Sequence, residues 1–164
     1  MDAGLLVARL VLGLLMAAHG AQKLFGWFGG HGLAGTAGYM EQLGFRPGRR
    51  FAAAAAMTEV ASGLLVALGF LGPVGPALML SVMIVAAVSV HWEHGVFAMT
   101  NGIEVPLLYA AGAATLALAG SGRYSIDYLL GTGTAWPPVA AWAALAIAVL
   151  GAVANLSARR PTAA

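Results

Sequence analysis

The sequence predicts an all-α protein built as an integral membrane helical bundle, and two observations carry this prediction. Hydrophobic residue types make up 60% of the 164 residues and charged types only 9%, whereas soluble domains carry about 25% charged residues. Apolar stretches close to the roughly 20 residues that a membrane helix needs recur along the whole chain. This composition excludes intrinsic disorder and leaves no room for an attached soluble domain.

The charge and cysteine counts exclude further classes. The chain has no cysteine, which rules out disulfides, thiolate metal sites and iron–sulfur clusters on it. Its eight Lys and Arg residues do not form the clustered basic face that nucleic-acid binding requires. We therefore expect the positions of the positive charges to indicate the orientation of the chain across the membrane.

The first predicted span covers residues 4–28 and is unusual in holding polar side chains. They are Arg9, His19, Gln22 and Lys23. We expect this span to be retained, because its small residues make a poor signal-peptide cleavage site. Residues 29–50 follow as a glycine-punctuated loop that holds one short interfacial helix.

Four further spans are predicted, at residues 51–71, 74–92, 103–119 and 137–156. The second and third are joined by a Gly-Pro turn, the third and fourth by a short loop, and the last two by a polar, glycine-rich segment. A proline in the first turn of the fourth span is tolerated because its missing N–H would be unpaired there. The fifth span has no ionisable residue, so we expect it to serve packing or oligomerisation and not the site.

The basic residues outside the spans predict the orientation. With five spans, the three arginines of residues 46–50 and the two at residues 159–160 lie on one side, against Arg123 on the other. Cytoplasmic loops are enriched in Lys and Arg. The sequence therefore predicts an N-terminus outside and a C-terminus in the cytoplasm.

The polar residues within the spans are predicted to converge on one half of the bilayer. At about 1.5 Å per residue, His19 and Glu59 lie at about 12 to 14 Å from the same membrane face. Nearer that face lie Gln22, Lys23, His91 and Glu104. Ionisable residues in the membrane usually face the bundle interior and mark a functional path.

At the opposite end of the first span, Arg9 is predicted to form an ion pair with Asp127, which follows the fourth span. The pair would tie the first and fourth helices together. The alternative is that Arg9 extends to the lipid headgroups.

The chemistry that this cluster suggests is proton handling beside a redox ligand. His19 and Glu59 are the candidate catalytic pair, since imidazole and a buried carboxyl both suit acid–base work. A quinone site needs hydrogen-bonding groups between apolar and aromatic walls, for which Trp27, Trp92 and Tyr109 are available. The alternative is that His19 and Glu59 form an interhelical hydrogen bond that only specifies the bundle.

A metal or haem site is the weaker interpretation of the histidines. His91 and His94 share a helix face at a spacing of three residues, and His19 with His91 could hold a haem between the first and third spans. No third ligand is fixed by spacing, and polar aromatic residues are common at membrane boundaries. We expect neither a metal nor a haem.

Several motifs together resemble the DoxX family of small bacterial membrane proteins. The most specific is the run His19-Gly20-Ala21-Gln22-Lys23-Leu24-Phe25-Gly26 after Arg9 and Gly13. Glu59 with Gly63, His91 with Gly95 and Phe97, Glu104, and the segment from Gly122 to Asp127 are similar in order and spacing. The resemblance covers about residues 4–130.

This resemblance implies a four-helix membrane domain at residues 1–130 in the bacterial inner membrane. The fifth span departs from the family pattern, since many relatives end soon after the position that matches Asp127, and residues 131–164 thus add a transmembrane helix and a basic tail. It also implies a link to quinone-dependent oxidation of sulfur compounds or to oxidative and thiol stress. The name-giving relatives are subunits of a thiosulfate:quinone oxidoreductase.

Three functions follow as hypotheses. In the first, the chain binds quinone or a similar redox molecule, with His19 and Glu59 handling protons and Gln22, Lys23, His91 and Glu104 shaping the polar mouth. In the second, it is a non-enzymatic subunit that recruits or stabilises a partner oxidoreductase. The expected partners are membrane lipids, this oxidoreductase and further copies of the chain in a homo-oligomer. In the third, it is a small transporter or a proton path.

Overall fold

The computed structural model describes residues 1–160, and these form helices, turns and loops without a β-strand. The α-helices are α1 (Asp2–Phe25), α2 (Gly32–Gln42), α3 (Gly48–Leu68), α4 (Val74–Ala86), α5 (Glu104–Ala119), α6 (Ile126–Leu129) and α7 (Pro138–Ser157). Short 3-10 or π segments are η1 (Trp27–Gly29), η2 (Ala87–His91), η3 (Trp92–His94), η4 (Ala98–Thr100) and η5 (Gly133–Ala135). The all-α prediction is confirmed.

The helices agree with the predicted spans. Four are long and apolar enough to cross a membrane: α1, α3, the continuous segment Val74–His94 and α7. The fifth, α5, is apolar but has only 16 residues, which gives a length of about 24 Å. The predicted short helix in residues 29–50 is α2.

Two glycines end the first long helices. Gly26 has φ 75° and closes α1, three residues before the predicted end, and Gly69 closes α3 with φ 63°. A left-handed backbone at a helix C-terminus favours glycine because it carries no Cβ. After α1 the chain turns through η1 into α2.

Helices α1 and α3 lie against each other at backbone distance. A Cβ atom placed on Gly13 would stand 2.6 Å from the Gly63 oxygen, and one placed on Gly20 would stand 2.7 Å from the Ala56 oxygen. Small residues permit such close approach in membrane bundles. This contact fixes the side chains of α1 and α3 relative to each other.

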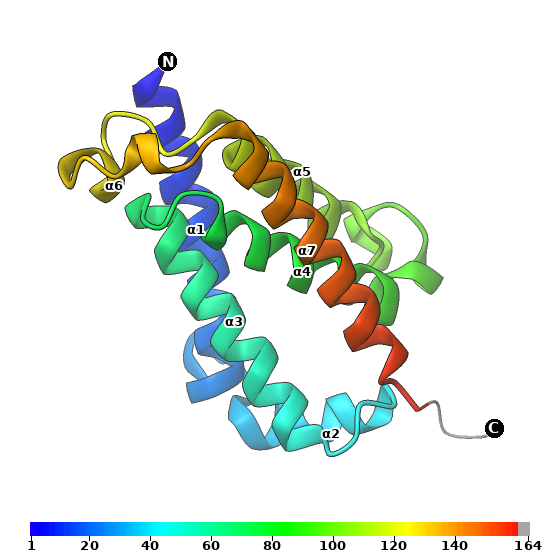
Figure 1. The fold of residues 1–164 in the computed structure, drawn as a ribbon. Coiled ribbons are helices and arrows are strands. Elements are labelled where there is room, and N and C mark those ends of the chain that lie inside the picture. The colour runs from blue at the N-terminus through cyan, green and yellow to red at the C-terminus, as the bar shows by residue number, and fades with distance from the viewer. Residues whose placement is uncertain (161–164) are drawn as a thin grey trace.

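Helix α7 is integrated into the bundle. It runs beside α4 and α5 (Figure 1), and its C-terminal end reaches the turn between α2 and α3. There the Arg159 Nε donates to the Leu43 oxygen at 2.5 Å, and the Arg160 N–H donates to the Gly44 oxygen at 2.8 Å. Helix α7 therefore spans from the α4–α5 side to the α2 end.

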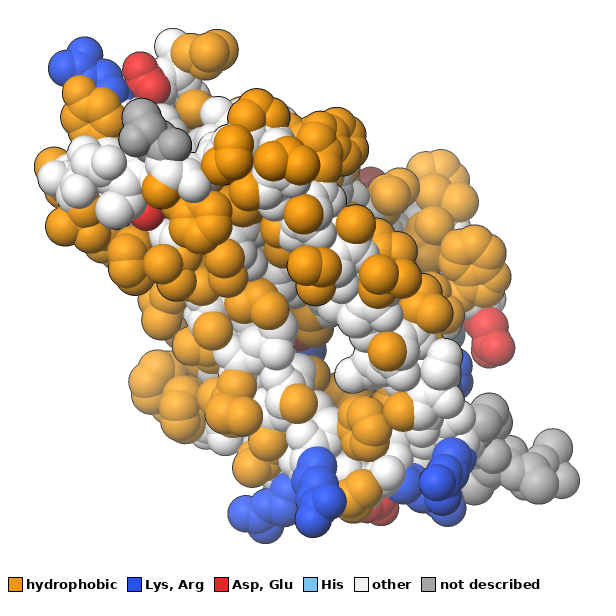
Figure 2. All heavy atoms as spheres, viewed as in Figure 1, with side chains coloured by type: hydrophobic (Ala, Val, Ile, Leu, Met, Phe, Trp, Pro, Cys, Tyr) orange, Lys and Arg blue, Asp and Glu red, His pale blue; other side chains and the backbone are white. Residues whose placement is uncertain are grey.

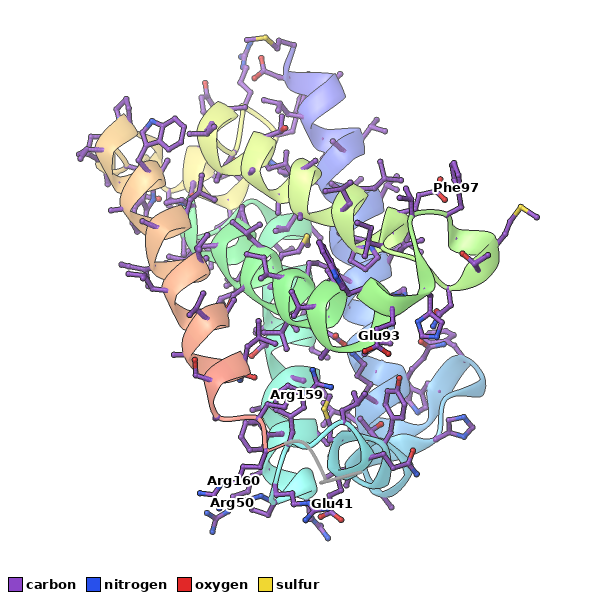
Figure 3. The ribbon with its side chains drawn as sticks, turned by 90° about the vertical axis from the view of Figure 1, so that its right-hand side faces the viewer. Glu41, Arg50, Glu93, Phe97, Arg159 and Arg160 are labelled. Atoms are coloured by element: carbon purple, nitrogen blue, oxygen red, sulfur yellow. The ribbon has the colours of Figure 1, made fainter. Side chains whose placement is uncertain are left out.

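The predicted separation of basic residues is found in the fold. Arg50, Arg159 and Arg160 lie together at one end, beside Glu41 (Figure 3). The N-terminus lies at the opposite end (Figure 1), where the Arg123 backbone N–H donates to the Asp2 carboxylate at 3.1 Å. Much of the surface between the two ends is apolar (Figure 2), as expected for lipid contact.

Candidate functional site

A cavity of about 530 Å³ lies in the half of the bundle toward the arginine-rich end. Its walls come from the C-terminal parts of α1, α4 and α7 and the N-terminal parts of α3 and α5, with α2 also contributing. Among the lining residues, the ionisable ones are His19, Lys23, Tyr39, Glu59, His91 and Tyr109. The antiparallel order of the helices brings these distant positions together, and the depth argument had grouped His19, Lys23, Glu59 and His91 among them.

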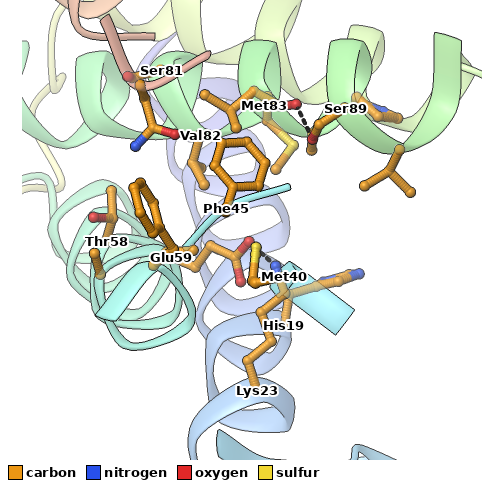
Figure 4. Close-up of a pocket in the computed structure, with 18 of the residues that line it drawn as sticks. His19, Lys23, Met40, Phe45, Thr58, Glu59, Ser81, Val82, Met83 and Ser89 are labelled. Carbon is orange, nitrogen blue, oxygen red and sulfur yellow. Dashed lines mark hydrogen bonds and ion pairs between the residues drawn. The ribbon is translucent and has the colours of Figure 1, made fainter. Parts of the chain in front are cut away.

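The centre of the polar lining is an ion pair between α1 and α3. The Lys23 Nζ donates to Glu59 Oε1 (Figure 4). The Glu59 side chain is only 1% exposed and the Lys23 side chain 30%. The second carboxylate oxygen, Oε2, is buried and has no hydrogen-bond partner. A buried, unpartnered carboxylate oxygen is costly, so it is the strongest sign of a ligand position in this cavity.

His19 lines the cavity but does not bond to Glu59, with which the sequence argument had grouped it. Its Nδ1 lies 2.8 Å from the Leu15 oxygen, and its ring meets Tyr109 edge-on with centroids 6.2 Å apart. Lys23 takes the place expected for His19 because helical side chains lean toward the N-terminus of their helix. In antiparallel helices this leaning moves Lys23 and Glu59 toward each other.

A second histidine of the lining is His91, at the end of η2. Its Nδ1 lies 2.7 Å from the Asn101 oxygen in the following loop. The backbone at positions 87–91 is a π-helical turn, and such turns frequently occur at functional sites. His91 is therefore anchored through one ring nitrogen.

Four predicted binding residues lie outside the cavity lining. The Gln22 amide donates to the Phe28 oxygen at 3.2 Å, and Glu104 accepts from the Ala98 N–H at 2.7 Å, so both hold loops. The side chains of Trp27 and Trp92 are exposed at the surface. The depth argument had grouped Gln22 and Glu104 with the cluster, but the rotation of their helices directs both side chains to loops.

The expectation that the fifth span has no part in the site is wrong. Gly151 and Asn155 of α7 line the cavity, because α7 packs on α4 and reaches the α2 end. A signal was present in the sequence, since Asn155 is a polar residue within an otherwise apolar stretch. Depth alone could not place it, because no partner helix for α7 was known.

Aromatic walls also come from positions that the sequence argument assigned to a loop and a helix start. Phe45 is 1% exposed and its ring lies 5.3 Å from that of Phe51. Both line the cavity, and Phe45 lies beside Val82 and Met83 (Figure 4). Of the three aromatic residues predicted as walls, Tyr109 lines the cavity.

The predicted ion pair between Arg9 and Asp127 does not form directly. Arg9 is buried, which also overturns its extension to the headgroups, and its guanidinium donates to the backbone oxygens of Ser121, Tyr124 and Ala67. The Asp127 carboxylate accepts from the N–H groups of Leu71 and Gly72 at 3.1 and 2.7 Å. The carboxylate also accepts from the hydroxyls of Ser121 and Thr132 at 3.3 and 3.1 Å. Both charges thus lie at the same junction of helix ends, but each bonds to other groups.

The cavity can bind a small ligand that carries hydrogen-bonding groups on an apolar body. Within residues 1–160, no three His, Asp or Glu side chains gather where they could hold a metal ion. The ionisable groups that the walls offer are one carboxylate, one ammonium, two imidazoles and two phenols, among mainly apolar side chains. These groups can hold polar atoms of a ligand and exchange protons with them.

The comparisons with known proteins give one match. A family model described as DoxX matches residues 4–92. This range contains all but the first two residues of α1, the whole of α2, α3 and α4, and with them Lys23, Glu59, His19 and His91. No curated protein and no solved structure matches the chain.

Proposed function

The chain belongs to the DoxX family, and from this premise we propose that it binds a quinone or a similar small redox molecule of the membrane in the cavity. The observation that carries the proposal is the buried Glu59 oxygen without a partner, on a side chain that lines a cavity inside a membrane bundle. A ligand with polar oxygens on an apolar ring would give this carboxylate a hydrogen-bonding partner and fill the apolar part of the cavity.

The size and lining of the cavity support this ligand class. Ligand sites typically enclose about 300 to 1,000 Å³ and are mainly apolar with a few placed polar groups. The cavity, at about 530 Å³, lies within this range. Phe45 and Phe51 supply flat apolar walls, and the Lys23–Glu59 pair supplies the polar end.

The position of the opening supports a ligand that arrives from the lipid. The surface is hollowed between α3 and α7 (Figure 2), and both helices contribute to the cavity wall. Both helices carry exposed apolar side chains, among them Met57 on α3 and Ile147 and Leu150 on α7. A hydrophobic molecule could pass there without crossing a polar surface.

In this proposal His19 and Glu59 exchange protons with the ligand, while Lys23 and His91 orient its polar atoms. Two-electron reduction of a quinone consumes two protons, so two titratable groups beside the ligand suit that chemistry. We place the chain in the bacterial inner membrane, with the arginine-rich end in the cytoplasm, in sulfur-compound oxidation or in the response to oxidative or thiol stress.

The test is to identify and measure the ligand directly. Lipid-soluble molecules extracted from the purified protein should include a quinone by mass spectrometry. A short-chain ubiquinone or menaquinone analogue, offered oxidised and reduced, should bind, and His19→Ala and Glu59→Gln should each weaken binding. Glu93→Gln is the control, because Glu93 is exposed (Figure 3). Unchanged binding in both cavity variants would sink the proposal.

A second candidate function is recruitment of a partner oxidoreductase. The loop after η2 carries apolar side chains that are strongly exposed: Trp92 at 67%, Phe97 at 69% and Met99 at 98%. Exposed apolar patches mark protein or membrane contacts. Co-purification of a stoichiometric oxidoreductase without bound quinone, lost in Phe97→Ser, would favour recruitment over ligand binding.

A further inference from the structure

The polar groups of the cavity differ in what they can offer a ligand, and the most deeply buried of them, the Glu59 carboxylate, only accepts hydrogen bonds. We propose that the cavity binds the reduced, hydroxyl-bearing hydroquinone in preference to the quinone. This inference rests on the proposed function, because it concerns which redox form of that ligand the site takes. It concerns binding alone and assigns no electron transfer to the chain.

Glu59 provides the first acceptor. As the partner of the Lys23 ammonium it is a carboxylate, and an ionised carboxylate only accepts hydrogen bonds. Oxygen Oε1 receives Lys23, whereas Oε2 is buried without a partner. An O–H group of a ligand satisfies Oε2, but the carbonyl oxygen of a quinone would meet it with repulsion.

The two histidines provide further acceptors. The Nδ1 of His19 lies 2.8 Å from the Leu15 oxygen, and the Nδ1 of His91 lies 2.7 Å from the Asn101 oxygen. A backbone carbonyl only accepts, so each Nδ1 carries the hydrogen. In the neutral imidazole the other nitrogen, Nε2, is then an acceptor.

The other polar groups do not exclude either redox form. The hydroxyls of the lining and the Asn155 amide can donate or accept, although the Ser89 hydroxyl already donates to the Val85 oxygen at 2.6 Å. Lys23 also donates, and one of its N–H groups is already given to Glu59. A hydroquinone brings two O–H donors to this set, whereas a quinone brings none.

The experiment compares the redox forms on the intact protein. Purified protein is titrated without oxygen with a short-chain ubiquinone analogue, with its hydroquinone, and with the hydroquinone dimethyl ether, which lacks both O–H groups. One added hydrogen bond to a charged group corresponds to an affinity gain of about tenfold or more. We expect the hydroquinone to bind at least about tenfold more tightly than the other two forms.

Variants assign the preference to named acceptors. Glu59→Gln keeps the shape of the side chain but adds an amide donor, so the hydroquinone should lose far more affinity than the quinone, leaving a preference of about threefold or less. His19→Phe keeps the ring beside Tyr109 and removes Nε2, and should reduce the preference as well. Glu93→Gln should retain the full preference.

The outcomes separate the two levels of the argument. Equal or tighter binding of the quinone by the unaltered protein overturns this inference and leaves the proposed function standing. Binding of none of the three compounds overturns the proposed function itself. The comparison on the unaltered protein does not depend on whether Glu59→Gln folds. A folded Glu59→Gln variant with an undiminished preference overturns the assignment to Glu59.

Discussion

Lys23 and Glu59 show how two residues predicted to share a site acquire a specific contact. The sequence placed both near one membrane face, but it grouped Glu59 with His19 by depth. Lys23 reaches Glu59 because its side chain leans back along α1 and is long enough to bring the ammonium to the carboxylate. The pair joins α1 to α3 where Glu59 is buried.

Removal of one partner should therefore be more harmful than removal of both. Lys23→Met leaves the Glu59 carboxylate buried without compensation, which costs about 3 to 5 kcal/mol in unfolding free energy. The double variant Lys23→Met with Glu59→Gln should recover part of this loss. Thermal and denaturant unfolding in detergent measures both.

The exposed Arg49 supplies the control, because Arg49→Met removes a positive charge with no ion pair to break. If Lys23→Met were as stable as Arg49→Met, the ion pair would make no contribution to the free energy of unfolding.

At the scale of elements, the contact between α1 and α3 is set by residues without bulk. Gly13 and Gly20 on α1 and Gly63 on α3 lie where an added Cβ would meet backbone atoms of the other helix at 2.5 to 2.7 Å. Backbone atoms cannot move aside as a flexible side chain can. These glycines therefore fix the spacing that lets Lys23 reach Glu59.

The same substitution, glycine to alanine, made separately at two positions of α1 tests this contact. Gly13→Ala should destabilise the protein by roughly 1 to 3 kcal/mol, because overpacking forces the helices apart. Gly4→Ala should be neutral or slightly stabilising, by up to about 1 kcal/mol, since open space surrounds Gly4 and alanine favours a helix.

Unfolding in detergent gives both values on the same helix. Similar losses at the two positions would mean that the α1–α3 contact does not require glycine. A loss at Gly13 should also weaken ligand binding, because the cavity lies between the same helices.

At the scale of the whole molecule, the basic residues divide the two ends. Arg50, Arg159 and Arg160 share one end (Figure 3), and the N-terminus and Arg123 share the other. From the distribution of Lys and Arg we propose that the first end faces the cytoplasm. In that orientation the cavity would lie in the cytoplasmic half of the bilayer, closer to protons and reductants of the cell interior.

Single cysteines test this orientation, and the absence of natural cysteine makes labelling specific. Leu129→Cys and Ala158→Cys both replace exposed residues at opposite ends. A membrane-impermeant maleimide should label Leu129→Cys in intact cells and Ala158→Cys only after the membrane is opened. The reverse pattern would invert the topology and place the cavity in the outer half.

The sequence by itself determined the class of protein, the spans and the level of the site. Composition alone required membrane helices, and antiparallel order brought His19, Lys23, Glu59 and His91 to one level, because depth along a helix follows directly from residue number. The division of the arginines between the two ends followed in the same way. The resemblance to the DoxX family was based on motifs that contain His19, Lys23, Glu59 and His91.

Only the tertiary structure decided which of these residues share a cavity. The rotation of each helix directs Gln22 and Glu104 to loops and Lys23 to Glu59, and the packing of α7 brings Asn155 into the wall. Arg9 and Asp127 likewise turned to backbone groups instead of each other. Rotation and choice of neighbour depend on contacts between helices, and in an apolar chain the hydrophobic pattern that would reveal a buried face is nearly uniform.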